Sequence, residues 1–212
     1  MRGRKKSEHT RAAILRCAAE VFSERPFHEV LTDEISGRLK MGKGTLYRYF
    51  ASKEELYFAT LLDGLQGMQD AISAVLARRA ALDKVIEALT GTIIGYFWQR
   101  RDFFILLHRH EAKIDASERV EWTQRREELV ARVGDRIAME LGPTRVDPRV
   151  AVEMLFGMIR AVCLYRDDTA KPAALARLVT RTFLGGVRVG MQPRTPALAA
   201  VSAVSRRAGA KR

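Results

Sequence analysis

Helical periodicity recurs along almost the whole chain, and this feature restricts the fold most strongly. The first segment to show it carries Ile14, Leu15, Ala18, Val21 and Phe22. Their spacing of i, i+1, i+4, i+7 and i+8 places them on one face of a helix. The same pattern returns over residues 82–98, 101–113, 118–141, 148–167 and 172–190. Since the alternation typical of strands is scarce, the sequence predicts an all-α fold of about nine helices.

Start and stop signals divide the first 60 residues into short helices and one long helix. Proline disfavours helical geometry in the residue before it, so the first helix should end near Arg25-Pro26. Thr32 is the predicted N-cap of a second helix that ends near Leu39. A short third helix is expected over residues 43–50, and Ser52 with Glu55 forms a predicted capping box for a long fourth helix.

Composition narrows the range of partners. Lys and Arg number 37 and Asp and Glu 25, so the net charge is +12, which favours a polyanion such as nucleic acid or an anionic membrane surface. Cys17 and Cys163 are too few and too far apart for a disulfide framework or a zinc site. No apolar run is long enough to span a membrane, and the basic N-terminus does not resemble a signal peptide. We expect a cytoplasmic protein with no metal, no cofactor and no membrane partner.

Residues 32–50 have the spacing of a helix-turn-helix, in which the second helix enters the major groove of DNA. On a helical wheel Leu46 and Phe50 point to the core. The remaining positions form an outward polar face with two flanking phenols: Gly44, Thr45 and Arg48, with Tyr47 and Tyr49 at the edges.

The chemistry of this face suits DNA. Arg48 can donate two hydrogen bonds to guanine O6 and N7, and Thr45 can contact a base edge or a thymine methyl group. Lys43, Lys53 and the hydroxyls of Tyr47 and Tyr49 are candidate phosphate contacts. The alternative is that both tyrosines are ordinary packing residues of a small helical domain.

The run GKGTLYRYFASKEEL, residues 42–56, resembles the recognition helix and following turn of the TetR family of bacterial regulators. The resemblance implies a homodimer that binds a near-palindromic operator, usually as a repressor, and a cytoplasmic protein associated with the nucleoid when bound to DNA. By motif position it implies DNA contacts from Thr32, Lys43, Thr45, Tyr47, Tyr49 and Lys53. Two positions depart from the family pattern: Lys40 stands where glycine is usual in the turn, and Gly42 replaces the commoner serine or threonine.

The centre of the chain is aromatic, and in this family the corresponding helices surround a ligand cavity. The predicted ligand-binding residues are Phe97, Trp98, Phe103, Phe104, His108, Trp122 and Arg160. Gln99 or Arg109 are further candidates for polar groups, and arginines among aromatics suit an apolar ligand with an acidic head. Simple core packing is the alternative for each aromatic.

The last two long helices offer a predicted dimer interface, because apolar and small residues recur on one side of each. Its predicted members are Val150, Met154, Met158, Ala161, Leu175, Leu178, Val179, Thr182, Phe183 and Gly186. The predicted domains are therefore a DNA-binding domain with a basic N-terminal arm (1–52), a regulatory and dimerisation domain (53–190) and a basic tail without fixed structure (191–212).

The sequence thus predicts a sequence-specific DNA-binding regulator, a repressor that a small, largely apolar effector releases from a palindromic operator. Two alternatives remain open at this point. One is a basic protein that binds DNA without a ligand or without sequence preference. The other is a small helical enzyme, against which stands the lack of a glycine-rich phosphate loop or a nucleophile elbow.

Overall fold

The computed structural model describes residues 2–110, 116–141, 147–165 and 169–191, and within these ranges it contains nine α-helices, one 3₁₀ turn and no strand. The all-α prediction is confirmed. The elements are α1 (Arg2–Glu24), η1 (Phe27–Glu29), α2 (Thr32–Arg38), α3 (Lys43–Tyr47), α4 (Lys53–Leu76), α5 (Leu82–Gln99), α6 (Arg101–His110), α7 (Ala116–Leu141), α8 (Pro148–Leu164) and α9 (Pro172–Met191). The predicted tail, apart from Met191, lies outside the described residues.

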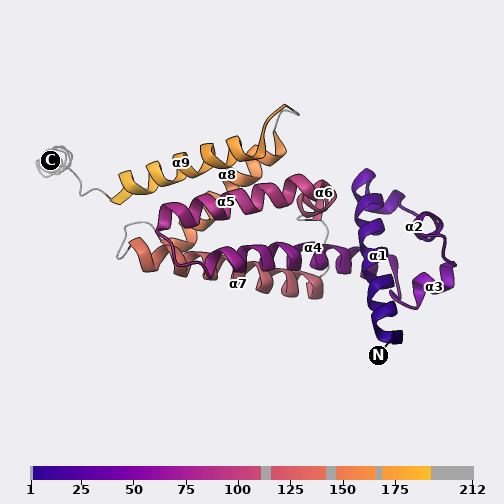
Figure 1. Cartoon of the computed structure of the whole chain (residues 1–212). Coiled ribbons are helices and arrows are strands. Elements are labelled where there is room, and N and C mark those ends of the chain that lie inside the picture. The colour runs from indigo at the N-terminus through magenta and orange to yellow at the C-terminus, as the bar shows by residue number, and fades with distance from the viewer. Residues whose placement is uncertain (1, 111–115, 142–146, 166–168, 192–212) are drawn as a thin grey trace, which may run out of the picture.

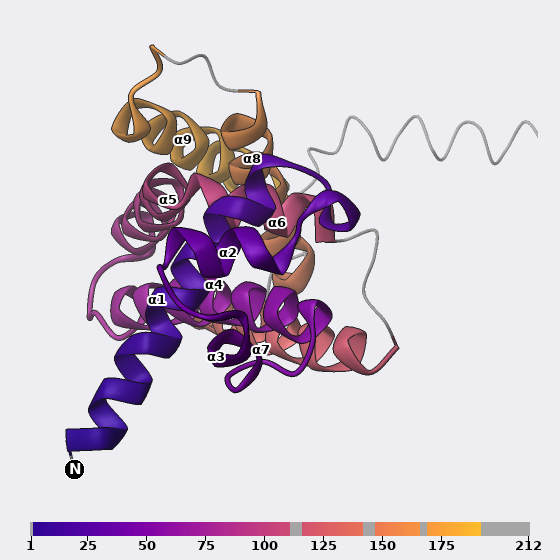
Figure 2. The same cartoon turned by 90° about the vertical axis from the view of Figure 1, so that its right-hand side faces the viewer.

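The helices form a headpiece at one end and a larger body beside it (Figure 1). The headpiece contains α1, α2 and α3, and α4 runs from it into the body. Within the body, α5 packs against α4 on one side and against α8 and α9 on the other, while α7 contacts α4 and α8. Figure 2 looks onto the headpiece and shows α9 and α7 on opposite sides of the body. No helix of the described ranges has the length and apolar character needed to cross a membrane.

Local capping explains where two of the long helices begin. Ser52 Oγ accepts a hydrogen bond from the Glu55 amide at 3.0 Å, and the Glu55 carboxylate accepts one from the Ala51 amide at 2.6 Å. The predicted capping box therefore opens α4, with the glutamate reaching one residue further back than in the standard arrangement. Asp147 caps α8 in a similar way, its Oδ1 accepting from the Arg149 amide at 2.7 Å.

Two predictions for the headpiece are wrong in detail. Leu31, not Thr32, occupies the N-cap of α2, and no side chain caps that helix. The Thr32 hydroxyl instead lies 3.1 Å from the Tyr47 hydroxyl, a tertiary partner that local sequence does not reveal. The third helix ends at Tyr47 rather than near Phe50, and Arg48 follows it with φ −74° and ψ −21°.

The start of α4 is built into the headpiece core. The ring of Tyr57 packs edge-on against Phe22 and Phe27, with centroid separations of 4.9 and 5.1 Å. Leu56 is buried in the same cluster. Helix α4 therefore belongs to both the headpiece core and the body.

The turn between α2 and α3 contains a strained residue. Lys40 has a φ of 51°, the only positive φ of a non-glycine residue in the described part of the chain. The amides of Lys40 and Met41 close the turn on the carbonyls of Gly37 and Ser36, each at 3.0 Å. Lys40, which stands where the family usually has glycine, therefore adopts the left-handed conformation that glycine holds more easily.

Replacing Lys40 by glycine is expected to stabilise the protein by about 0.5–1 kcal/mol. A left-handed conformation costs a residue with a Cβ atom about 1–2 kcal/mol, and the flexibility of glycine in the unfolded chain offsets part of that gain. Urea unfolding measures the change. Lys40→Ala removes the same charge but retains the strain, so a glycine variant no more stable than the alanine variant would contradict the prediction.

Candidate nucleic-acid interface and ligand cavity

The α2–α3 unit separates a buried side from an exposed polar side. Leu46 and Phe50 are buried in the headpiece core, as the wheel predicts. Lys43, Gly44 and Arg48 are exposed. Tyr47 is 39% exposed and Thr45 is half-buried, so both reach the surface of the same short segment.

Two side-chain pairs join α2 to α3. The hydroxyls of Thr32 and Tyr47 form one hydrogen bond, and Asp33 Oδ1 lies 2.7 Å from Lys43 Nζ. The hydrogen bond to Asp33 raises the pKa of Lys43 above its usual value. The Thr32–Tyr47 hydrogen bond links the two helices, and Asp33 pairs with the Lys43 ammonium group at the exposed surface.

Tyr49 faces α1 rather than lying freely on the surface. Its ring packs against the headpiece core, and a hydrogen bond to Ser7 lowers the pKa of Tyr49. Lys6, also on α1, lies close enough to add to that shift. The predicted basic arm is part of α1, which is helical from Arg2. Its exposed Lys5 and Lys6 lie on the same helix as Ser7, the hydrogen-bond partner of Tyr49.

Lys53 makes contacts that stabilise the headpiece. Its Nζ donates to the carbonyls of Phe27 and Val30 at 3.0 and 3.1 Å and lies 4.3 Å from the centre of the Phe27 ring. The ammonium group thereby fastens the start of α4 to the turn before α2. Two of its three hydrogens are used in this way, which leaves one for the predicted phosphate contact.

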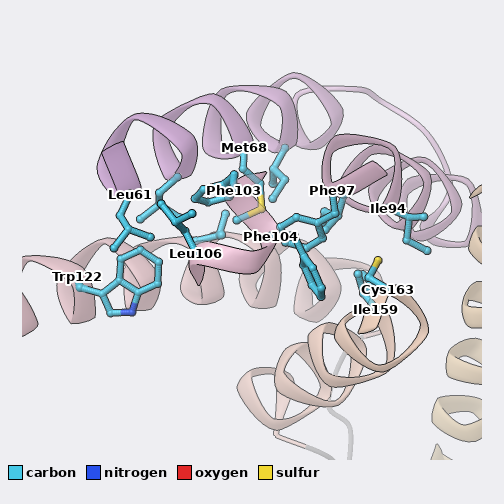
Figure 3. Packing of buried hydrophobic residues seen from close by; sticks show 14 of the residues in the cluster. Leu61, Met68, Ile94, Phe97, Phe103, Phe104, Leu106, Trp122, Ile159 and Cys163 are labelled. Carbon is cyan, nitrogen blue, oxygen red and sulfur yellow. The ribbon is translucent and has the colours of Figure 1, made fainter. Parts of the chain in front are cut away.

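A cavity of about 420 Å³ lies in the body. Figure 3 shows buried side chains from α4 to α8 converging in this part of the core. The cavity is lined by Leu65, Met68, Ile72, Ile93, Phe97, Leu107, His108, Trp122, Thr123, Arg126, Leu129, Glu153, Phe156, Gly157, Ile159 and Arg160. Its volume is within the range of small-molecule sites, about 300–1,000 Å³.

The structure divides the predicted ligand-binding residues into two groups. Phe97, His108, Trp122 and Arg160 line the cavity. Trp98, Phe103 and Phe104 do not. Phe103 is 1% exposed and packs against α4 at Gly64, where an added Cβ would lie 2.1 Å from its ring. The structure favours a packing role for these three aromatic residues.

Sequence reasoning missed part of the polar lining. Arg126 of α7 and Glu153 of α8 form an ion pair with an N–O distance of 2.5 Å. Arg160 Nη2 lies 2.8 Å from His108 Nδ1, which joins α8 to α6. Their separation in sequence is 27 and 52 residues respectively, so no local pattern brings either pair together.

Gln99 and Arg109, two further candidates, do not line the cavity. Arg109 Nη1 instead donates to the carbonyl of Ser23 at 3.1 Å. That carbonyl belongs to the last turn of α1, where helix carbonyls lack partners within the helix. Since Leu107 and His108 line the cavity, α6 contacts both the cavity and the headpiece.

The predicted dimer residues also separate by exposure. Val150, Met154, Ala161, Leu178, Thr182 and Gly186 are exposed, and Met158 and Leu175 are half-buried. Val179 and Phe183 are buried in the core of this chain. These two cannot supply an outer surface, so we retain only the exposed and half-buried residues as the proposed interface and call them the α8–α9 face.

The two cysteines lie in the core. Cys17 and Cys163 are free thiols and buried, and burial raises the pKa of Cys17. In the described ranges no group of three or more His, Cys, Asp or Glu side chains is arranged to hold a metal ion.

Comparison with known proteins agrees with this architecture. Residues 14–60 match the family described as "Bacterial regulatory proteins, tetR family". The transcriptional activator FasR of Mycolicibacterium smegmatis is 36% identical over 85 residues, covering 38% of this chain and 39% of FasR. YdeS of Bacillus subtilis, an HTH-type transcriptional regulator, is 24% identical over 192 residues, covering 87% of this chain and 93% of YdeS.

Solved structures share the fold over both parts of the molecule. FadR of Bacillus halodurans aligns with a TM-score of 0.74 at 18% identity, covering 84% of this chain and 96% of that one. FadR of Bacillus subtilis, solved in complex with stearoyl-CoA, aligns with a TM-score of 0.72 at 16% identity, covering 83% and 98%.

The fold and the α2–α3 unit define an all-helical protein with a helix-turn-helix headpiece. Residues 14–60, which include α2, α3 and the first turns of α4, match the tetR family of bacterial regulatory proteins.

Proposed function

We propose that the protein is a sequence-specific transcriptional repressor that binds a near-palindromic operator as a homodimer and leaves it when a small effector occupies the cavity. One observation carries the DNA-binding part. Lys43, Gly44 and Arg48 are exposed on one side of α3 and its following turn. Leu46 and Phe50, on the opposite side, are buried in the headpiece core. An arginine on the outward side of a helix-turn-helix can donate two hydrogen bonds to a guanine in the major groove.

Arg48→Ala is expected to weaken operator binding by about 1–3 kcal/mol and to relax sequence preference at one base pair. The operator is first obtained by selection from a random DNA library, and fluorescence anisotropy then measures affinity for it and for single-base variants. Arg78→Ala, which removes an exposed arginine beyond the end of α4, is the control and should bind like the unmodified protein. Equal weakening on every sequence would reduce Arg48 to a phosphate contact.

The route from cavity to headpiece runs through two helices. Leu65, Met68 and Ile72 place α4 against the cavity, and the same helix begins in the headpiece core. Helix α6 lines the cavity with His108 and holds the end of α1 through Arg109. An effector that changes the position of either helix alters the separation of the two recognition helices, while operator half-sites lie about 34–36 Å apart.

The fold relative FadR of Bacillus subtilis was solved in complex with stearoyl-CoA, which supports a ligand-binding role for a protein of this fold. The regulatory part of the proposal is tested by reciprocity. An effector that lowers operator affinity must itself bind less tightly, by the same factor, once the operator is bound. Equal effector affinities with and without DNA would leave the body as a dimerisation scaffold.

A further inference from the structure

The lining of the cavity is divided by polarity. Every residue that α4 and α5 contribute is apolar and buried: Leu65, Met68, Ile72, Ile93 and Phe97. All polar and charged lining residues come from α6, α7 and α8: His108, Thr123, Arg126, Glu153 and Arg160. Four of these five are exposed and the fifth, Glu153, is half-buried. The cavity therefore has an apolar floor and a polar mouth.

The charged groups at the mouth favour an anion. Among the lining residues, Arg126 and Arg160 are cations and Glu153 is the one anion. Glu153 already pairs with Arg126. A cationic ligand would have to approach two guanidinium groups, whereas a carboxylate can accept two parallel hydrogen bonds from one of them.

We propose that the effector is an amphipathic monoanion, with an apolar tail on the α4–α5 floor and a single acid group at the mouth between Arg126 and Arg160. This inference rests on the proposed function in that it takes the cavity as the effector site. The apolar tail supplies affinity by leaving water. The guanidinium groups select the acid over an alcohol or an amine of equal length.

Glu153 should weaken the binding of an acidic effector. Its carboxylate pairs with Arg126, so an incoming acid competes with Glu153 or binds Arg160. Neutralising Glu153 should therefore strengthen the binding of an acid, the opposite of what removing either arginine should do. A purely apolar pocket would respond to none of these changes.

The test compares decanoate, tetradecanoate, decanol and decylammonium by isothermal titration calorimetry on the full-length protein. We expect at least one of the two carboxylates to bind, and decanoate to bind roughly tenfold or more tightly than decanol, with decylammonium weakest. Arg160→Gln and Arg126→Gln should each weaken carboxylate binding by about tenfold and leave decanol unaffected. Glu153→Gln should strengthen carboxylate binding. Arg132→Gln is the matched control, because Arg132 is an exposed arginine of α7 that does not line the cavity.

Three outcomes would overturn the inference: decanol or decylammonium binding as tightly as decanoate, neither carboxylate binding, or arginine variants that bind carboxylate as well as the unmodified protein. Operator binding is measured on the same preparations. A protein that binds operator but no carboxylate disproves the effector class alone, whereas loss of all specific DNA binding disproves the proposed function itself.

Discussion

Met154→Asp is expected to convert the proposed homodimer into monomers and to lower operator affinity by a factor of about 10²–10⁴, the advantage that linking two binding modules typically provides. Met154 is 59% exposed in the single chain and lies on the α8–α9 face. In a dimer formed through this face the new carboxylate would be buried without a partner. Sedimentation velocity gives the oligomeric state, and fluorescence anisotropy gives the affinity for the selected operator.

Met139→Asp is the control for Met154→Asp. Met139 is 81% exposed on α7 and is not a member of the α8–α9 face, so Met139→Asp should remain dimeric and bind the operator normally. Leu178→Glu on α9, at 50% exposure, should reproduce the effect of Met154→Asp. Phe183→Glu is a poor test because Phe183 is buried in the chain's own core. Dimers that persist in both Met154→Asp and Leu178→Glu would place the interface elsewhere.

Phe103→Ala is expected to destabilise the fold by about 3–5 kcal/mol, the usual cost of removing a buried phenylalanine ring. Phe103 contacts Tyr96 and Phe97 at centroid separations of 5.9 and 6.2 Å, and it packs directly on Gly64. Urea unfolding measures the loss. Because this ring does not line the cavity, the substitution should lower the free energy of unfolding and leave the affinity for the effector largely unchanged.

A double-mutant cycle with Gly64 sharpens this prediction. In the unmodified protein Gly64→Ala forces a Cβ atom into the Phe103 ring, and overpacking of this kind costs about 1–3 kcal/mol. In the Phe103→Ala background the same substitution should stabilise, since alanine is about 1 kcal/mol better than glycine inside a helix. An identical effect of Gly64→Ala in both backgrounds would show that the two residues do not interact.

Features that depend on neighbours in sequence were predictable. The helices follow from apolar spacing, and Ser52 with Glu55 marks the start of α4, because a cap is formed by residues three or four positions apart. Lys40 was marked only by the resemblance, which places glycine at this position of the turn. Leu46 and Phe50 were placed correctly in the core because four residues span about one helical turn.

Features that depend on packing between distant helices were decided only by the tertiary structure. Helical periodicity marks Phe103, Phe104 and His108 as side chains of one helix, but it does not say that the first two meet other core residues while the third reaches the cavity. The partners of Thr32, Arg109 and Glu153 lie 15 to 87 residues away in sequence. A sequence pattern reports which face of a helix a residue occupies, whereas the residue's role depends on which other helix covers that face.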